Sequence, residues 1–462
     1  MTNTYDALII GAGQASPPLA GRLTAAGMSV ALIERKLFGG TCVNTGCIPT
    51  KTLIASAYAA QLARRARDYG VSTGEVAVDM KAVKARKDAI STRAREGVES
   101  WLESMGRCTV YRGHARFVSP REVQVGPDRL TAKYIFINVG ARARVPDLPG
   151  IDGVATLTNT SILELDTLPR HLVVVGGSYV GLEFAQMYRR FGAQVTVVEM
   201  APRLVAREDE DVSAAIKQIL EAEGITVHLG AECIRFEPQG VEIAVGLECA
   251  SGPPEVTGSH VLLAVGRRPN TDDLGLDMAG VEVDARGYIA VDDELRTSAP
   301  DIWALGDCNG RGAFTHTSYN DFEIVAANLL DGERRRVSDR ILGYALYIDP
   351  PLGRVGMTEA QARASGRPLL VGRRPMTRVG RAIEKGETLG FMMTIADAET
   401  QHILGAAILG TGGDEAIHGI LDAMNARTPY TQLKWAVPIH PTVSELIPTL
   451  LGDMKPVQPQ SP

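Results

Sequence analysis

Two parts of the chain repeat the same succession of apolar and polar positions. The first is an apolar run at 5–10 that ends in Gly-Ala-Gly, then an Ala-rich stretch, then a second apolar run at 28–34. The second part, at 171–199, is HLVVVGGSYVGLEFAQMYRRFGAQVTVVE. An apolar run, a glycine turn, a helical stretch and another apolar run predict a strand–helix–strand unit. Each part therefore predicts two parallel strands of an α/β sheet that are joined by a helix.

Outside these two units the pattern changes. Residues 50–97 are rich in Ala, Lys and Arg and predict two helices. From about residue 340 onwards, short apolar runs alternate with helical stretches, and no glycine-rich loop accompanies them. The further strands that we expect are 302–305, 354–357, 390–395 and 403–409, and the polar, Pro-rich tail at 455–462 is expected to fray.

The composition is that of an ordinary globular protein. The chain has 462 residues, which predicts two to four domains, and 45% of them are hydrophobic and 22% charged. A net charge of −6 offers no basic surface for nucleic acid or for an anionic membrane. No apolar run reaches the roughly 18 residues that span a bilayer. The N-terminus shows no secretory leader pattern, and six cysteines are too few for a secreted disulfide scaffold, so we expect a cytoplasmic protein.

The glycine turn of the first unit approximates the G-x-G-x-x-G/A pattern of dinucleotide-binding loops. Gly11 permits the tight turn, Gly13 lets backbone N–H groups approach a pyrophosphate, and Ser16 is small but departs from the pattern. Glu34 ends the next strand, where its carboxylate would accept hydrogen bonds from a ribose. With a strand before it and an acid after it, this loop predicts a dinucleotide site.

The second unit repeats this plan. Gly176, Ser178 and Gly181 occupy the loop positions, and Glu199 ends the second strand. In both units the acid follows the first glycine by 23 residues. A carboxylate there favours a free 2′-hydroxyl and repels a 2′-phosphate, which predicts NADH rather than NADPH. Two arginines that follow, Arg203 and Arg207, would offset this preference if they turned inward.

The segment GGTCVNTGCIPTK at 39–51 carries the most specific chemistry. Cys42 and Cys47 are five residues apart and can close a small ring. Pro49 suits the first turn of a helix, so we expect Cys47 at a helix N-terminus, where the dipole stabilises a thiolate and lowers its pKa. The alternatives are a zinc half-site or two buried thiols, but no second cysteine pair or nearby His completes a zinc site. The pair therefore predicts a reversible dithiol.

Polar side chains at element ends form two further motifs. Asp307 follows the expected strand 302–305, where it either binds a cofactor hydroxyl or caps the next helix. His440 lies five residues before Glu445 in HPTVSE, which suits a carboxylate-oriented general base or a surface histidine at a helix start. Gly266 opens a basic turn after an apolar run and by itself indicates little.

Together, and in this order, the motifs closely resemble those of the FAD-dependent pyridine nucleotide–disulfide oxidoreductases, the family of glutathione reductase, dihydrolipoamide dehydrogenase and mercuric reductase. The resemblance rests on GGTCVNTGCIPTK, GGSYVGLE, ALGD and HPTVSE and covers nearly the whole chain. It implies an α/β fold with two Rossmann-like dinucleotide-binding domains and a C-terminal α+β dimerisation domain. The implied division is FAD-binding at 1–145 and 270–335, NAD(P)-binding at 150–265 and dimerisation at 340–462.

The resemblance also implies a role for the residues around the cysteines. Cys47 would be the thiolate beside the flavin, and Cys42 the exposed interchange thiol. Lys51 would pair with Glu183 beside the flavin, and Tyr179 would gate the nicotinamide pocket. The implied cofactor-binding residues, for FAD and NADH or NADPH, are Gly11, Gly13, Ser16, Glu34, Gly40, Thr41, Lys51, Asp307, Gly176, Ser178, Tyr179, Gly181, Glu199 and Gly266.

In such a family member the active unit is a homodimer whose site is shared between chains. His440 and Glu445 would complete the thiol site of the partner subunit, and His440 would move the proton. Electrons would pass from NADH or NADPH through FAD to the pair Cys42 and Cys47, and then to a small oxidised disulfide substrate.

Two other functions stay open. One is the reduction of a soft metal ion such as Hg²⁺ or Cu²⁺, or of another reactive oxidant. The chain has no cysteine after Cys308, so it lacks the terminal cysteine pair of mercuric reductases. The other is a non-catalytic redox sensor that retains the cofactor, against which the intact cysteines, His440 and Glu445 argue.

Overall fold

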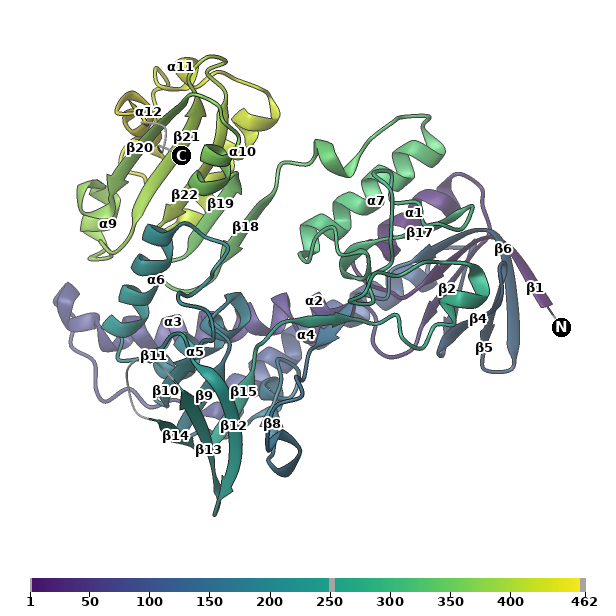
Figure 1. Cartoon of the computed structure of the whole chain (residues 1–462), viewed down its shortest axis with the longest axis horizontal. Coiled ribbons are helices and arrows are strands. Elements are labelled where there is room, and N and C mark those ends of the chain that lie inside the picture. The colour runs from purple at the N-terminus through teal and green to yellow at the C-terminus, as the bar shows by residue number, and fades with distance from the viewer. Residues whose placement is uncertain (1, 249–253, 458–462) are drawn as a thin grey trace.

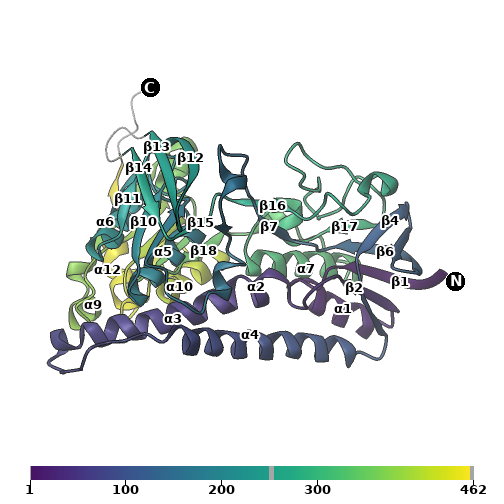
Figure 2. The same ribbon diagram turned by 90° about the horizontal axis from the view of Figure 1, so that it is seen from below.

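The computed structural model describes residues 2–248 and 254–457. Figure 1 shows an N-terminal sheet on the right, a second sheet at the lower left and a C-terminal sheet above it. The two long helices α3 (Cys47–Arg64) and α4 (Met80–Glu103) run side by side along one edge of the molecule in Figure 2. They confirm the two helices expected in this region, and α3 packs against both α4 and α5.

The first sheet is built around the apolar run at the N-terminus. Its strand order is β3-β2-β1-β6-β5-β4, and β17 pairs with β6. The second half of β1 is fully buried and pairs in parallel with β2 and β6, as expected for a strand covered on both faces. The helix α1 (Ser16–Ala25) begins after the glycine turn, with two prolines in its first turn, where N–H groups have no helical partner. The strands are β1 (Thr2–Ile10), β2 (Val30–Glu34), β3 (Cys108–Arg112), β4 (Ala115–Ser119), β5 (Glu122–Val125), β6 (Asp128–Ile137) and β17 (Ile302–Ala304).

The second sheet has the order β11-β10-β9-β15-β8, and the helix α5 (Tyr179–Phe191) joins β9 to β10. Both expected strand–helix–strand units are thereby confirmed. Buried side chains of this sheet and of α5 share one hydrophobic core with Leu346, Ile348 and Leu352 of the C-terminal region. The strands are β8 (Thr156–Leu157), β9 (His171–Val175), β10 (Gln194–Val198), β11 (Thr226–His228) and β15 (His260–Leu263); α6 (Glu210–Ala222) follows β10, and β12 (Glu232–Gln239), β13 (Glu242–Glu248) and β14 (Glu255–Gly258) form an antiparallel annex.

The expectation that Gly266 opens a turn is wrong. Its residues form β16 (Arg267–Pro269), which pairs antiparallel with β7 (Ala141–Ala143). Only the distant partner strand makes this pairing possible, so the local sequence could not indicate it.

The C-terminal sheet is antiparallel, with the order β18-β19-β22-β21-β20-β23. A Cβ on Gly353 of β19 would lie 2.3 Å from the carbonyl oxygen of Gly413, so the N-terminus of α10 rests directly on this strand. The expected fraying of the tail is wrong at its first two residues, which form β23 and pair with β20; residues 458–462 lie outside the described residues. The elements are β18 (Gly343–Leu346), β19 (Leu352–Gly356), β20 (Leu369–Pro375), β21 (Phe391–Asp397), β22 (Ile403–Leu409), β23 (Lys455–Pro456), α7 (Thr315–Leu330), α8 (Glu359–Ala364), α9 (Gly380–Glu384), α10 (Gly413–Asn425), α11 (Tyr430–Leu433) and α12 (Ile447–Gly452).

Within 2–248 and 254–457, none of the helices combines the length and the apolar character that crossing a bilayer requires.

Candidate active site

The two cysteines of the 39–51 segment meet at the start of α3. Cys42 lies in the short helix α2 (Gly40–Asn44), Cys47 is the first residue of α3, and both are free thiols. Hydrogen bonds from Cys42 and from Thr315, together with the charge of Lys51, lower the pKa of Cys47 to about 6. The same bond to the Cys47 sulfur, and then burial, raise the pKa of Cys42. At neutral pH the pair therefore holds one thiolate, on Cys47, and one proton, on Cys42.

The two thiols differ in exposure in the chain by itself. Cys47 is exposed in this chain and Cys42 is only half-exposed. The reason is that α2 packs on α3 and α4, whereas Cys47 opens the first turn of its helix. The open side of Cys47 is the side that the resemblance assigns to the flavin, so the assignment of Cys42 as the interchange thiol stays a prediction.

A charged pair lies one turn along α3 from Cys47. Lys51 Nζ donates to Glu183 Oε2 of α5 at 2.7 Å, and Glu183 is almost fully buried. The second oxygen, Glu183 Oε1, accepts the backbone N–H of Tyr347 at 3.0 Å. The ammonium of Lys51 also lies 4.6 Å from the centre of the Tyr347 ring. Three distant parts of the chain thus fix one lysine beside the thiols, and sequence reasoning did not find Tyr347.

The first glycine loop lies against the end of β6. Gly11 has φ +96°, and a Cβ there would lie 2.4 Å from the carbonyl oxygen of Asn138, so only glycine fits. Gly13 lies against the side chain of Asn138, and Gly40 against Gly13. Ser16 is fully buried and accepts a hydrogen bond from Asn138 Nδ2 at 2.8 Å. Ser16, which departs from the dinucleotide-binding pattern, therefore has a hydrogen-bond partner in the buried amide of Asn138, which sequence reasoning missed.

The two strand-end carboxylates are held in the same way. Glu34 accepts the N–H of Ala12 at 2.8 Å, and Glu199 accepts the N–H of Gly177 at 2.5 Å. The second oxygen of each accepts the N–H of the residue two positions further on, at 2.7 Å in both cases. Each carboxylate is thus anchored across its glycine loop, and each oxygen retains a lone pair for a ribose hydroxyl.

The second glycine loop is closely packed. Gly176 has φ +118°, and a Cβ on it would lie 2.4 Å from the carbonyl oxygen of Ala264. A Cβ on Gly181 would lie 2.0 Å from the carbonyl oxygen of Gly176, so the third glycine lets α5 rest on the loop. Ser178 is the exposed N-cap residue of α5 and leaves the backbone N–H groups of the first turn open.

Tyr179 begins α5 within an aromatic cluster. Its ring lies edge-on to Tyr344 and Phe314, with centroids 5.5 and 6.3 Å away. Its hydroxyl lies 3.4 Å from Glu208 Oε1, which also accepts from the Tyr344 hydroxyl at 2.6 Å. The fully buried Arg354 pairs with this same carboxylate. The ring therefore lies where the nucleotide loop meets the C-terminal sheet.

Asp307 lies at the junction of the first sheet and the second glycine unit. Burial raises the pKa of Asp307, and Arg267, with Nε 3.5 Å from its carboxylate, opposes that rise. Arg267 also donates to Thr41 Oγ1 at 3.3 Å and to a backbone carbonyl. Gly266, with no Cβ neighbour within 4 Å, leads the chain into this arginine. A half-buried guanidinium beside a carboxylate and an alcohol suits the polar middle of a dinucleotide.

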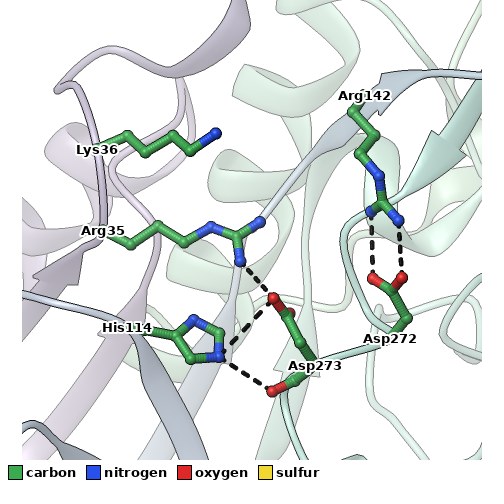
Figure 3. A pocket seen from close by; sticks show the side chains of 6 residues that line it. All are labelled: Arg35, Lys36, His114, Arg142, Asp272 and Asp273. Carbon is green, nitrogen blue, oxygen red and sulfur yellow. Dashed lines mark hydrogen bonds and ion pairs between the residues drawn. The ribbon is translucent and has the colours of Figure 1, made fainter.

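A hollow of about 420 Å³ opens beyond Glu34. Figure 3 shows that its basic side chains meet two neighbouring carboxylates, and Lys36 extends alongside without a drawn bond. The Lys36 backbone N–H is one of the two that donate to Glu34, so the hollow adjoins the expected ribose site. Its lining is Arg35, Lys36, His114, Arg142, Asp272 and Asp273, none of which sequence reasoning singled out.

These features test whether the residues fit the expected FAD. The close-packed glycine loop after β1, the anchored Glu34 at the end of β2 and Asp307 after β17 lie at the same carboxyl edge of parallel strands. A close backbone approach for a pyrophosphate and carboxylates for hydroxyl groups thus meet at one edge of the sheet, and the residues fit FAD.

His440 and Glu445 form a pair at the other end of the molecule. His440 Nδ1 lies 2.8 Å from Glu445 Oε2, and the histidine side chain is 79% exposed. The helix α12, which follows them, lies far from α2 in Figure 1. The chain by itself thus does not bring His440 to its own thiols. Among the described residues, no group of three or more His, Cys, Asp or Glu side chains could hold a metal ion.

Comparison with known proteins gives the same picture. Residues 5–321 match the family described as pyridine nucleotide-disulphide oxidoreductase, and residues 343–451 match its dimerisation domain. The chain is 36% identical over 461 residues to the probable pyridine nucleotide-disulfide oxidoreductase RclA of Escherichia coli (strain K12), covering 98% of this chain and 100% of that protein. It is 34% identical over 435 residues to the mercuric reductase of Streptomyces lividans, covering 93% and 92%.

A solved structure is similar over nearly the whole length. It is the Cu(II) complex of the HOCl-induced flavoprotein disulfide reductase RclA from Escherichia coli. The TM-score is 0.89 at 36% sequence identity, over 97% of this chain and 99% of that chain.

Proposed function

Because this chain belongs to the pyridine nucleotide-disulphide oxidoreductase family, we propose that Cys42 and Cys47 carry electrons to a small oxidised substrate. The chain is an FAD-containing, NAD(P)H-dependent oxidoreductase of the disulfide reductase type. When bound, FAD supplies two-electron transfer between the nicotinamide and a sulfur pair. The observation that carries the proposal is the meeting of Cys42 and Cys47 at the start of α3, beside the ion pair of Lys51 and Glu183.

The proposed thiol roles follow from which sulfur holds the proton. Cys47, with the lowered pKa, would face the flavin as a thiolate. Cys42 would pass its proton to His440 of the partner subunit and attack the substrate disulfide, forming a mixed disulfide and releasing one thiolate, which takes up that proton. The Cys47 thiolate would then attack the Cys42 sulfur, forming the Cys42–Cys47 disulfide and releasing the second thiolate. A reversible dithiol with few other cysteines suits a reducing compartment, which supports a cytoplasmic location.

The proposed division of the chain assigns 1–145 and 270–335 to FAD binding, 150–265 to nucleotide binding and 340–462 to dimerisation. It is supported by β17, which comes from the second segment and yet pairs with β6 of the first sheet.

The proposed homodimer would share each site between two chains. The chain carries a dimerisation domain at 343–451. Within it, Trp435, Val437 and Ile439 lead to His440 with exposed fractions of 78%, 97% and 80%. Three open apolar side chains on one short segment favour burial against a second copy. That burial would bring His440 and Glu445 to the partner's thiols.

The substrate is proposed to be a low-molecular-weight disulfide. A second candidate is Cu(II), favoured by the solved Cu(II) complex of the similar flavoprotein. NADH oxidation measured with a panel of disulfides, Cu(II) and Hg(II) separates the two. We expect turnover with a disulfide; turnover with the metal ions alone would favour the second candidate, and a folded, FAD-loaded protein that turns over none would contradict both.

We expect NADH to be used in preference to NADPH by at least about tenfold in kcat/KM, which corresponds to ~1.4 kcal/mol. Glu199 is anchored by two backbone N–H groups and cannot turn away from a 2′-phosphate. Arg203, the nearest offsetting cation in sequence, donates to the carbonyl of Ala206 in its own loop. Steady-state kinetics with both nucleotides check this, and Glu199→Gln should narrow the ratio. A higher kcat/KM with NADPH would refute it.

A further inference from the structure

The Cys47 sulfur has a neighbour from a distant part of the chain. Thr315 Oγ1 lies 3.2 Å from Cys47 Sγ, although the residues are 268 positions apart. Cys47 is the first residue of α3, and Thr315 is the first residue of α7. Two helix N-termini therefore meet at one sulfur atom, and both have their positive ends towards it.

Thr315 is held on a rigid support. The hydroxyl of Thr317 donates to the carbonyl of Phe314 at 2.8 Å and accepts the Phe314 N–H at 3.1 Å, which closes the first turn of α7. The Phe314 ring is stacked against His316 and Tyr344, with interplanar angles of 12° and 10°. Because threonine is branched at Cβ, its side chain has few rotamers in a helix. The hydroxyl is therefore fixed at the sulfur before any ligand arrives.

The direction of the hydrogen bond follows from the charge on sulfur. A thiolate has no proton to give, so Thr315 must donate and Cys47 must accept. A hydrogen bond to an ionised acceptor is stronger than a neutral one. The Cys42 thiol supplies one donor to this anion, and Thr315 supplies a second from the opposite segment.

We infer that Thr315 is a positioning residue of the thiol site, whose hydroxyl donates to the Cys47 thiolate and holds its sulfur in place. This inference rests on the proposed function for the role of Cys47, but the bond itself is a property of the chain. Thr315 thus links the segment that follows Asp307 to the redox pair.

We expect Thr315→Val to raise the pH midpoint of Cys47 ionisation by about one unit, a tenfold change in the proton equilibrium. Valine keeps the branched shape and removes only the donor. Two measurements report the midpoint. One is the pH titration of the long-wavelength thiolate–flavin charge-transfer absorbance of the reduced, FAD-loaded dimer. The other is the pH dependence of iodoacetamide alkylation of the Cys47 peptide, quantified by mass spectrometry, which needs no turnover.

Two further variants make the test specific. Thr315→Ser keeps the donor, so its midpoint of Cys47 ionisation should stay close to that of the unchanged chain. Thr52→Val removes a buried threonine hydroxyl that donates to the Ile48 carbonyl at 2.8 Å within α3, one turn beyond the thiols, and should leave the midpoint in place.

The inference would be overturned if the midpoint of Cys47 ionisation did not shift in Thr315→Val. It would also be overturned if that midpoint shifted equally in Thr52→Val, or shifted in Thr315→Ser as far as in Thr315→Val. If Thr315→Val does not fold, Thr315→Ala is measured against Thr315→Ser in the same way. Failure of the proposed function is a separate result, since a chain that turns over no substrate still gives an alkylation midpoint.

Discussion

Cys47→Ser is expected to lower the turnover rate by about 10³-fold or more. It should also remove the long-wavelength charge-transfer absorbance between the Cys47 thiolate and the flavin in the reduced holoprotein. In the unchanged chain the pKa of Cys47 is lowered to about 6, so most molecules hold a thiolate there at pH 7. A serine hydroxyl stays neutral at that pH and cannot donate electron density to the flavin. Absorbance spectra after addition of dithionite or NADH, and NADH oxidation with substrate, check the two expectations.

The matched variant is Cys42→Ser, which should also stop turnover but keep the absorbance. Thr315 and Lys51 still stabilise the Cys47 anion, and the serine hydroxyl can donate in place of the Cys42 thiol. In the unchanged chain the absorbance should be present above pH 6 and fade as the pH falls through about 6, because acid protonates the thiolate. If instead Cys42→Ser removes the absorbance and Cys47→Ser keeps it, the two thiol roles are inverted.

The parts of the site that follow from local sequence were predictable. Gly11 and Glu34, and likewise Gly176 and Glu199, belong to single strand–helix–strand units, and each carboxylate is held by the loop of its own unit. The position of Cys47 at a helix start also follows from its immediate neighbours. Sequence patterns of this kind predict the site correctly because the contacts that they require are formed within about thirty residues of the chain.

The remaining contacts join residues of ordinary type across long separations. Thr315 touches Cys47, and Asn138 donates to Ser16, but a threonine at a helix start and an asparagine at a strand end have many other uses. Tyr347 reaches Glu183 through its backbone N–H, which no side-chain pattern can indicate. The exposure of the thiols likewise depends on how α2 packs, and β16 depends on a partner strand more than 120 residues away.

His440→Ala is expected to slow disulfide reduction by about 10²–10⁴-fold, the usual contribution of a general base. His440 is held by Glu445 at 2.8 Å, so its other ring nitrogen is free to exchange a proton with a thiol or leaving group. Flavin reduction by NADH should stay nearly unchanged, because that step precedes the thiol chemistry. Rapid-mixing and steady-state measurements separate the two steps. Glu445→Gln should cost less, because it orients the imidazole rather than moving the proton.

Mixing two inactive chains should recover activity if each site is shared between subunits. A chain with Cys42→Ser and Cys47→Ser keeps His440, and a His440→Ala chain keeps both cysteines. After random subunit exchange, half of the dimers would be mixed, and each mixed dimer would hold one complete site. About one quarter of the unchanged activity should therefore return. The exposed His440, and the separation of α12 from α2 in Figure 1, make this the expected arrangement. If native mass spectrometry shows the mixed dimer and no activity returns, His440 does not act across the dimer, and its role must lie elsewhere.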